Sequence, residues 1–115
     1  MEDERRWRAL YAAFNARDVD AVLAELTADV DWPNAWEGGR VAGREAVRAY
    51  WTRQWATIDS RVEPVAITTR ADERVAVEVD QSACDLDGNL LGEARVTHVY
   101  TLRDGLVARM DVEES

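Results

Sequence analysis

The chain has 115 residues, 47% of them hydrophobic, and it carries a formal net charge of −9. A chain of this length has room for one domain with one core, so we expect a single domain over residues 1–115. The acidic net charge disfavours nucleic-acid and membrane partners. The chain has no apolar run of roughly 20 residues, which argues against a membrane-spanning helix. A lone cysteine is typical of a cytoplasmic protein.

Helical spacing dominates the first half of the chain. Apolar residues from Trp7 to Phe14 recur at helical intervals and predict an amphipathic helix. Asp18 is the expected N-cap of a second, short helix whose apolar side runs from Val19 to Leu26. A loop rich in Gly and Trp is expected over residues 31–43, and the stripe from Val47 to Ile58 predicts a third helix.

The pattern changes to a period of two near Arg61. Alternating apolar residues predict strands at 65–67, 75–79, 94–102 and about 106–113. The dipeptides Asp87-Gly88 and Asp104-Gly105 are typical of two-residue hairpin turns. Helices followed by an antiparallel meander indicate an α+β fold with helices over one face of a curved sheet.

The two turns also predict the strand register. Counting from Asp104-Gly105 places Arg103 opposite Leu106, Tyr100 opposite Arg109, and His98 opposite Asp111. Counting from Asp87-Gly88 places Val79 opposite Val96, Val77 opposite His98, and Asp80 opposite Arg95. Directly opposed residues share a face of a sheet, so one face collects the valines and becomes the buried face.

The predicted buried face also carries polar residues, namely Gln81, His98, Tyr100, Arg109 and Asp111. A buried charge is costly unless it has a partner, and an imidazole opposite a carboxylate is such a pair. We therefore interpret His98 and Asp111 as a candidate acid/base pair. The alternative is a satisfied structural pair at a dimer interface.

Five tryptophans supply further candidates. Trp7, Trp51 and Trp55 follow helical spacing and are most simply core residues. Trp32 and Trp36 lie in the Gly/Pro loop, where they would line the mouth of a pocket or seal its open end. One histidine without ligand spacing does not support a metal site, and Ser82 and Cys84 fall on the outer face of the predicted sheet.

Four segments resemble SnoaL-like (NTF2-like) proteins: YAAFNARD at 11–18, TADVDW at 27–32, GREAVRAYW at 43–51, and HVYTLRDGLVARMD at 98–111. The resemblance covers nearly the whole chain. It implies a cone of curved antiparallel sheet wrapped by three N-terminal helices, and a homodimer through the outer face of the sheet. The family includes ketosteroid isomerases, polyketide cyclases, limonene epoxide hydrolase and dehydratases.

Individual positions separate these activities. Steroid isomerases need an aspartate base in the loop where this chain has Trp32, Pro33 and Asn34, their helix-one tyrosine falls near Leu10, and their oxyanion-hole aspartic acid aligns roughly with His98. Polyketide cyclases match better, because the resemblance places His98 and Asp111 at their acid/base positions. Epoxide hydrolases use an Asp-Arg-Asp arrangement, of which Arg109 and Asp111 would supply part.

The sequence thus predicts a small-molecule pocket without cofactor or metal, with isomerase, cyclase or dehydratase chemistry on an apolar cyclic or polyketide-like substrate. Catalysis would rest on Asp111 and His98. The candidate substrate-binding residues are Tyr11, Trp32, Trp36, Trp51, Trp55, Gln81, Tyr100 and Arg109. The alternative is a non-catalytic ligand-binding or dimeric interaction module with the same fold.

Overall fold

A computed structural model describes residues 2–34 and 38–114 of the chain. The three predicted helices are present as α1 (Glu2–Asn15), α2 (Val19–Leu23) and α3 (Arg44–Trp55). The Asp18 side chain accepts a hydrogen bond from the Ala21 backbone N–H, so the predicted N-cap is confirmed. Within the described ranges, no helix is long and apolar enough to span a membrane.

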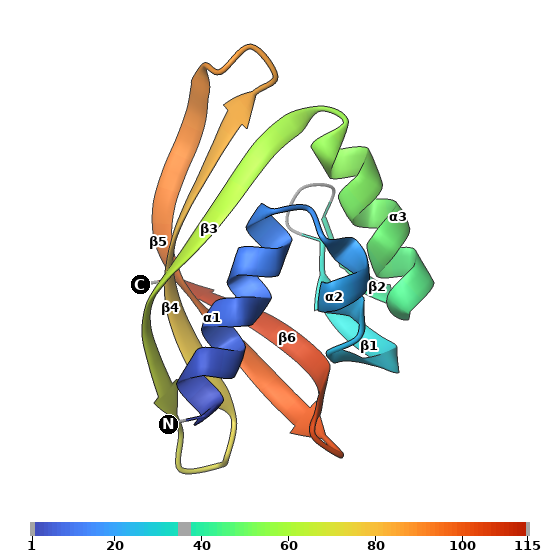
Figure 1. The fold of residues 1–115 in the computed structure, drawn as a ribbon, viewed down its shortest axis with the longest axis vertical. Helices are drawn as coiled ribbons and strands as arrows, with labels where there is room; N and C mark the ends of the chain where they lie inside the picture. The colour runs from blue at the N-terminus through green and yellow to red at the C-terminus, as the bar shows by residue number, and fades with distance from the viewer. Residues whose placement is uncertain (1, 35–37, 115) are drawn as a thin grey trace.

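Six strands form one sheet (Figure 1). They are β1 (Leu26–Pro33), β2 (Arg40–Ala42), β3 (Ile58–Thr69), β4 (Val75–Asp85), β5 (Leu90–Arg103) and β6 (Leu106–Glu114). Their order across the sheet is β2-β1-β6-β5-β4-β3. Neighbouring strands are antiparallel except β1 and β6, which run parallel.

The loop predicted over residues 31–43 is partly wrong, because β1 and β2 occupy much of it. The strand β1 begins at Leu26, which the helical pattern had assigned to the second helix, and Ile58 belongs to β3 rather than to the third helix. A segment such as β1 depends on a partner far along the chain, and it pairs with β6 about 80 residues later. Local periodicity does not report such pairing.

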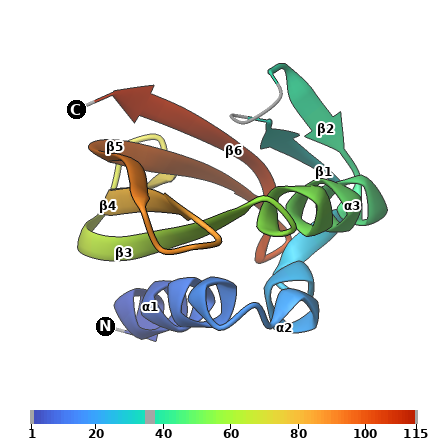
Figure 2. The same cartoon turned by 90° about the horizontal axis from the view of Figure 1, so that it is seen from above.

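The helices lie on the concave side of the curved sheet, as Figures 1 and 2 show, and the predicted fold class is confirmed. In Figure 2 the α1 helix runs across the mouth of the curve while α3 lies beside β1 and β2. The core between them contains Trp7, Trp51, Val77, Val79 and Val107, each 2% exposed or less. This burial explains the apolar stripes of the helices and the alternation of the strands.

The β4–β5 hairpin keeps its predicted register by two changes that cancel. Its turn is a three-residue loop, since the Asp85 N–H donates to the Asn89 carbonyl and Gly88 takes a φ of 91°. An extra residue, Leu91, then bulges between the pairs Cys84–Leu90 and Ala83–Gly92. The predicted pairs Val79–Val96, Val77–His98 and Asp80–Arg95 are therefore confirmed.

The β5–β6 hairpin departs from the prediction. Asp104 and Gly105 have φ values of 55° and 82°, which fits the expected two-residue turn, and Arg103 pairs with Leu106. A bulge at Ala108 then shifts the ladder by one residue. Tyr100 pairs with Met110 and His98 with Val112, so the predicted Tyr100–Arg109 and His98–Asp111 pairs are wrong.

This register makes Met110 an inward residue and Arg109 an outward one. We expect Met110→Ala to lower the free energy of unfolding by about 2 kcal/mol, because a buried thioether side chain that is 4% exposed is lost. The Arg109→Ala change should be much smaller, because exposed ion pairs contribute little. Urea unfolding of both variants measures this, and a larger loss for Arg109→Ala would contradict the register.

Candidate functional site

A cavity of about 510 Å³ lies between α1, α3 and the concave face of the sheet. Its buried lining is mostly aromatic and aliphatic, including Leu10, Trp32, Trp51, Val62 and Met110. The exposed lining residues mark its mouth; they are Arg61, the segment from Leu91 to Ala94, and Val112. The cavity is thus an apolar chamber with an opening to solvent.

Aromatic rings brace one another around this chamber. The Trp51 ring meets Trp32 edge to face at 5.4 Å and Phe14 at 5.3 Å between ring centroids. The Tyr100 ring packs on Trp7 at 4.6 Å. These contacts hold the aromatic side chains in place, so parts of the cavity wall are rigid and flat. Such a wall favours a ligand with flat faces.

One buried polar cluster interrupts these walls. Tyr11 on α1 reaches across to β5, where its hydroxyl oxygen lies 2.8 Å from His98 Nδ1 and 2.6 Å from the Tyr100 hydroxyl oxygen. The three residues meet because Tyr11 shares the buried face of α1 with Trp7, and because His98 and Tyr100 are alternate residues on the concave side of β5. We call Tyr11, His98 and Tyr100 the phenol–imidazole cluster.

Two proton arrangements satisfy this cluster. In the first, Tyr100 donates to Tyr11, Tyr11 donates to Nδ1, and Nε2–H is a hydrogen-bond donor for a ligand. In the second, Nδ1–H donates to Tyr11, Tyr11 donates to Tyr100, and Nε2 carries a free lone pair. Tyr11 occupies Nδ1 in both, so Nε2 is the nitrogen left for a ligand.

Burial controls the charge of the phenol–imidazole cluster. Loss of solvent lowers the pKa of His98 from 6.5 to about 4. Burial also raises the pKa of Tyr11, assisted by the neighbouring Tyr100, and it raises the pKa of Tyr100. All three side chains are therefore neutral near pH 7, and the two phenols remain proton donors.

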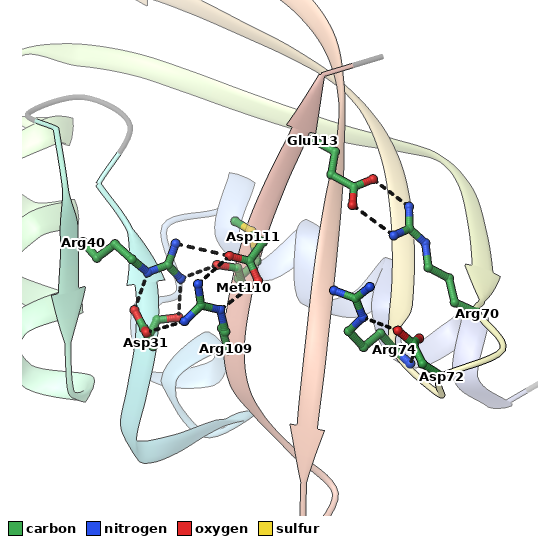
Figure 3. Close-up of polar contacts among 9 residues, drawn as sticks. All are labelled: Asp31, Arg40, Arg70, Asp72, Arg74, Arg109, Met110, Asp111 and Glu113. Carbon is green, nitrogen blue, oxygen red and sulfur yellow. Dashed lines mark hydrogen bonds and ion pairs between the residues drawn. The ribbon is translucent and has the colours of Figure 1, made fainter.

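Asp111 and Arg109 lie outside the cavity, on the convex face of the sheet (Figure 3). Arg109 bonds to Asp111 at 2.9 Å through Nε and to Asp31 at 2.8 Å through Nη1. Arg40 from β2 also contacts both aspartates. The hydrogen bond from Arg109 lowers the pKa of Asp111, which stays ionised. Asp31, Arg109 and Asp111 therefore form an Asp-Arg-Asp group. This group does not face the cavity, where an epoxide hydrolase of this fold would need it.

The other predicted residues divide between cavity and elsewhere. Gln81, Trp32, Trp51, Tyr100 and Tyr11 line the cavity. Trp55 lies outside it, in a smaller hollow where the Arg17 guanidinium stacks on its ring at 4.7 Å. Trp36 falls outside the described residues.

Among the cavity residues that the sequence interpretation missed is a hydrogen-bonded polar pair, Gln54 and Ser60. Gln54 follows Trp51 by three positions on α3 and so shares its inward face, and Ser60 precedes the buried Val62 by two positions on β3. Gln54 Nε2 donates to the Ser60 hydroxyl oxygen at 3.1 Å. The helical and strand patterns place both residues on inward faces. A polar residue within an apolar stripe does not by itself indicate a cavity.

A family model of the SnoaL-like domain matches residues 7–110 of the chain. The chain belongs to the SnoaL-like domain family. No curated protein matches this SnoaL-like sequence.

Solved structures share the SnoaL-like fold. A candidate polyketide cyclase from Xanthomonas campestris pv. campestris is 25% identical, with a TM-score of 0.79 over 93% of this chain and 85% of that chain. TerC, co-crystallised with polyporic acid, is 24% identical, with a TM-score of 0.78 over 93% and 86%. A Mycobacterium tuberculosis protein in complex with estradiol-17beta-hemisuccinate is 20% identical, with a TM-score of 0.77 over 90% and 85%.

The buried histidine predicts a pH dependence of stability for this SnoaL-like domain. Between pH 6.5 and about 4 the unfolded chain binds a proton at His98 that the folded chain does not, so falling pH favours unfolding. We expect a loss of roughly 2 kcal/mol in the free energy of unfolding between pH 7 and pH 5. Urea unfolding at a series of pH values measures this loss.

The His98→Asn variant is the control, since it keeps a hydrogen-bonding group for Tyr11 and removes the titration. Its stability should change little over the same interval, because the lowered pKa values of surface carboxylates such as Asp111 act at lower pH. An equal loss in both proteins would show that other groups cause it. As the only histidine, His98 also gives a single ring signal for direct NMR titration.

Proposed function

We propose that this SnoaL-like domain binds a flat, mainly apolar cyclic molecule bearing a carbonyl or phenolic oxygen, and moves a proton on it as an isomerase or cyclase does. The observation that carries the proposal is the phenol–imidazole cluster, the one buried group of proton-transferring side chains seen in the described lining of an aromatic cavity. The volume of about 510 Å³ lies within the usual range for small-molecule sites.

The comparisons support the ligand class. TerC and the Mycobacterium tuberculosis protein have this fold and were crystallised with polyporic acid and an estradiol derivative, both of which are built of rings. The candidate polyketide cyclase supports the reaction class. In this chain the rigid rings of Trp32 and Trp51 would stack against a similar flat body.

The proposed step uses the arrangement in which His98 Nε2 carries the lone pair. Nε2 takes a proton from the carbon beside the ligand's carbonyl, and the electron pair moves onto the carbonyl oxygen to form an enolate. The imidazolium is stabilised because Nδ1–H donates to Tyr11 and Tyr11 donates to Tyr100. The free Tyr100 hydroxyl donates to the enolate oxygen.

The proton then leaves His98 in one of two ways. In an isomerase it returns to a different carbon of the same molecule. In a cyclase the enolate carbon attacks a second carbonyl, and the proton goes to the oxygen of that carbonyl. Both routes regenerate neutral His98, which its lowered pKa favours.

A non-catalytic binding protein is the second candidate, and one observation favours it. Among the described residues that line the cavity the only carboxylate is Glu93, which is exposed at the mouth. The described interior of the cavity therefore offers no carboxylate as a general base. A base with a pKa of about 4 is also a weak one at neutral pH. In this case the cluster would only donate hydrogen bonds to a bound oxygen.

Deuterium exchange separates the two candidates. We expect the protein to accelerate exchange of the acidic protons of β-tetralone, a flat aromatic ketone, in deuterated buffer followed by NMR. His98→Asn should slow this exchange about 100-fold, and Tyr11→Phe by a smaller factor, because the proton acceptor or its hydrogen-bonded support is lost. Asp111→Asn is the matched control and should leave the rate unchanged, since Asp111 faces the convex side.

Equal rates in wild type and His98→Asn would refute the proton-transfer proposal. Binding of β-tetralone without any exchange would favour the binding protein. Binding is followed by tryptophan fluorescence, because Trp32 and Trp51 line the cavity.

We also propose that the convex face of the sheet pairs with a second copy of the chain. Its charged side chains alternate in sign, as in Arg70–Glu113 and Arg95–Asp80. Such a surface is complementary to itself.

Sedimentation equilibrium at moderate salt should give twice the mass of one chain, and a monomer mass would contradict the proposed dimer.

The cytoplasmic location of this protein stays a prediction.

A further inference from the structure

The cavity contains a second group of polar side chains, formed by Gln54, Ser60 and Gln81, which we call the amide–hydroxyl cluster. Gln54 on α3 bonds to Ser60 on β3 at 3.1 Å. Gln81 on β4 pairs across the sheet with Val62 and Ala94, which places it on the concave side. None of the three has a role in the proton transfer proposed above.

The register separates the two clusters along the cavity. Val77 is the β4 residue paired with His98, and Gln81 lies four residues farther along the same strand, about 13 Å away. Ser60 pairs with Ala83, six residues from Val77, or about 20 Å along the strand. The clusters thus lie at different ends of the cavity.

Apart from the two clusters, the buried lining of the cavity is mostly apolar. It includes Leu10, Val62 and Met110. Trp32 and Trp51 belong to the same lining, and the Trp32 ring lies 6.3 Å from that of Tyr100. A ligand that spans the cavity would therefore need an apolar body with polar groups only at its ends.

The amide–hydroxyl cluster retains capacity for a ligand. After its bond to Ser60, Gln54 still has a second N–H and a carbonyl oxygen, and Ser60 still has a hydroxyl proton to donate. Within the described part of the chain, the Gln81 side-chain amide has no hydrogen-bond partner. Polar groups that a ligand would cut off from water need a partner on that ligand.

We infer that the ligand is an elongated, rigid ring system with an oxygen or nitrogen at both ends, one held by the phenol–imidazole cluster and the other by the amide–hydroxyl cluster. This inference rests on the proposed small-molecule binding in the cavity. It narrows the substrate class, because a ring compound with a polar group at one end only leaves one cluster without a partner.

Matched probes test the inference. The first is para-terphenyl with a hydroxyl at each end, and the second is para-terphenyl with one terminal hydroxyl. Tryptophan fluorescence titration of the wild type should give a dissociation constant about tenfold lower for the diol than for the mono-hydroxyl compound. A tenfold difference corresponds to the free energy of about one hydrogen bond. In the double variant Gln54→Leu/Ser60→Ala the two constants should become nearly equal. Thr52→Ala, on the exposed side of α3, is the matched control and should keep the tenfold ratio.

Each result is decisive. Equal affinity of the wild type for the two probes, or an unchanged ratio in the double variant, would overturn the inference while leaving cavity binding intact. Failure of both probes to bind would overturn the inference and the proposed function together. If the double variant does not fold, Gln81→Leu provides the same comparison and should also reduce the ratio.

Discussion

The extra residue at Ala108 determines which chemistry each face of the sheet carries. Beyond this bulge, Met110 and Val112 turn toward the cavity, while Arg109 and Asp111 turn toward the convex face. Without it the alternation would place an arginine and an aspartate against Trp32 and Tyr100, and both charges would lose their solvent. The apolar cavity, the neutral phenol–imidazole cluster and the ion pairs of the convex face all depend on that one residue.

The bulge separates charge from apolar surface throughout the molecule. On the convex side, Arg40 of β2 and Arg109 of β6 bond to Asp31 and Asp111, and Arg70 of the β3–β4 turn bonds to Glu113, as Figure 3 shows. Inside the cavity, behind Arg61 and Glu93 at its mouth, the polar groups of the described residues are phenols, an imidazole, amides and hydroxyls, which are uncharged near neutral pH. Recognition in the cavity therefore relies on hydrogen-bond geometry and shape rather than on charge.

Much of this arrangement could be predicted from the sequence, and the failures have physical causes. The spacing of Trp7 and Tyr11 and the alternation of Val75 to Val79 report burial that local geometry imposes, so the helices and the central strands were predictable. The strand β1 gains its hydrogen bonds from β6, and no local pattern encodes a partner so distant. No sequence signal predicts the bulge either, because Val107, Ala108 and Arg109 follow the ordinary alternation of a strand. The predicted pairing of His98 with Asp111 was therefore wrong, whereas the predicted position of His98 on the buried face, opposite Val77, was right. Tyr11 was proposed as a substrate contact, but its bond to His98 depends on how closely α1 packs on the sheet.

The position of β6 has a consequence for biosynthesis. This strand lies between β1 and β5 in the sheet, although it is the last of the described strands to leave the ribosome. Until it emerges, β1 and β2 have no sheet to join, and the edges of β1 and β5 that pair with β6 lack their hydrogen-bond partners. Contacts of such large sequence separation form slowly, and strand edges left unpaired in the meantime promote aggregation. The nascent chain therefore depends on the rapid arrival of the β5–β6 hairpin.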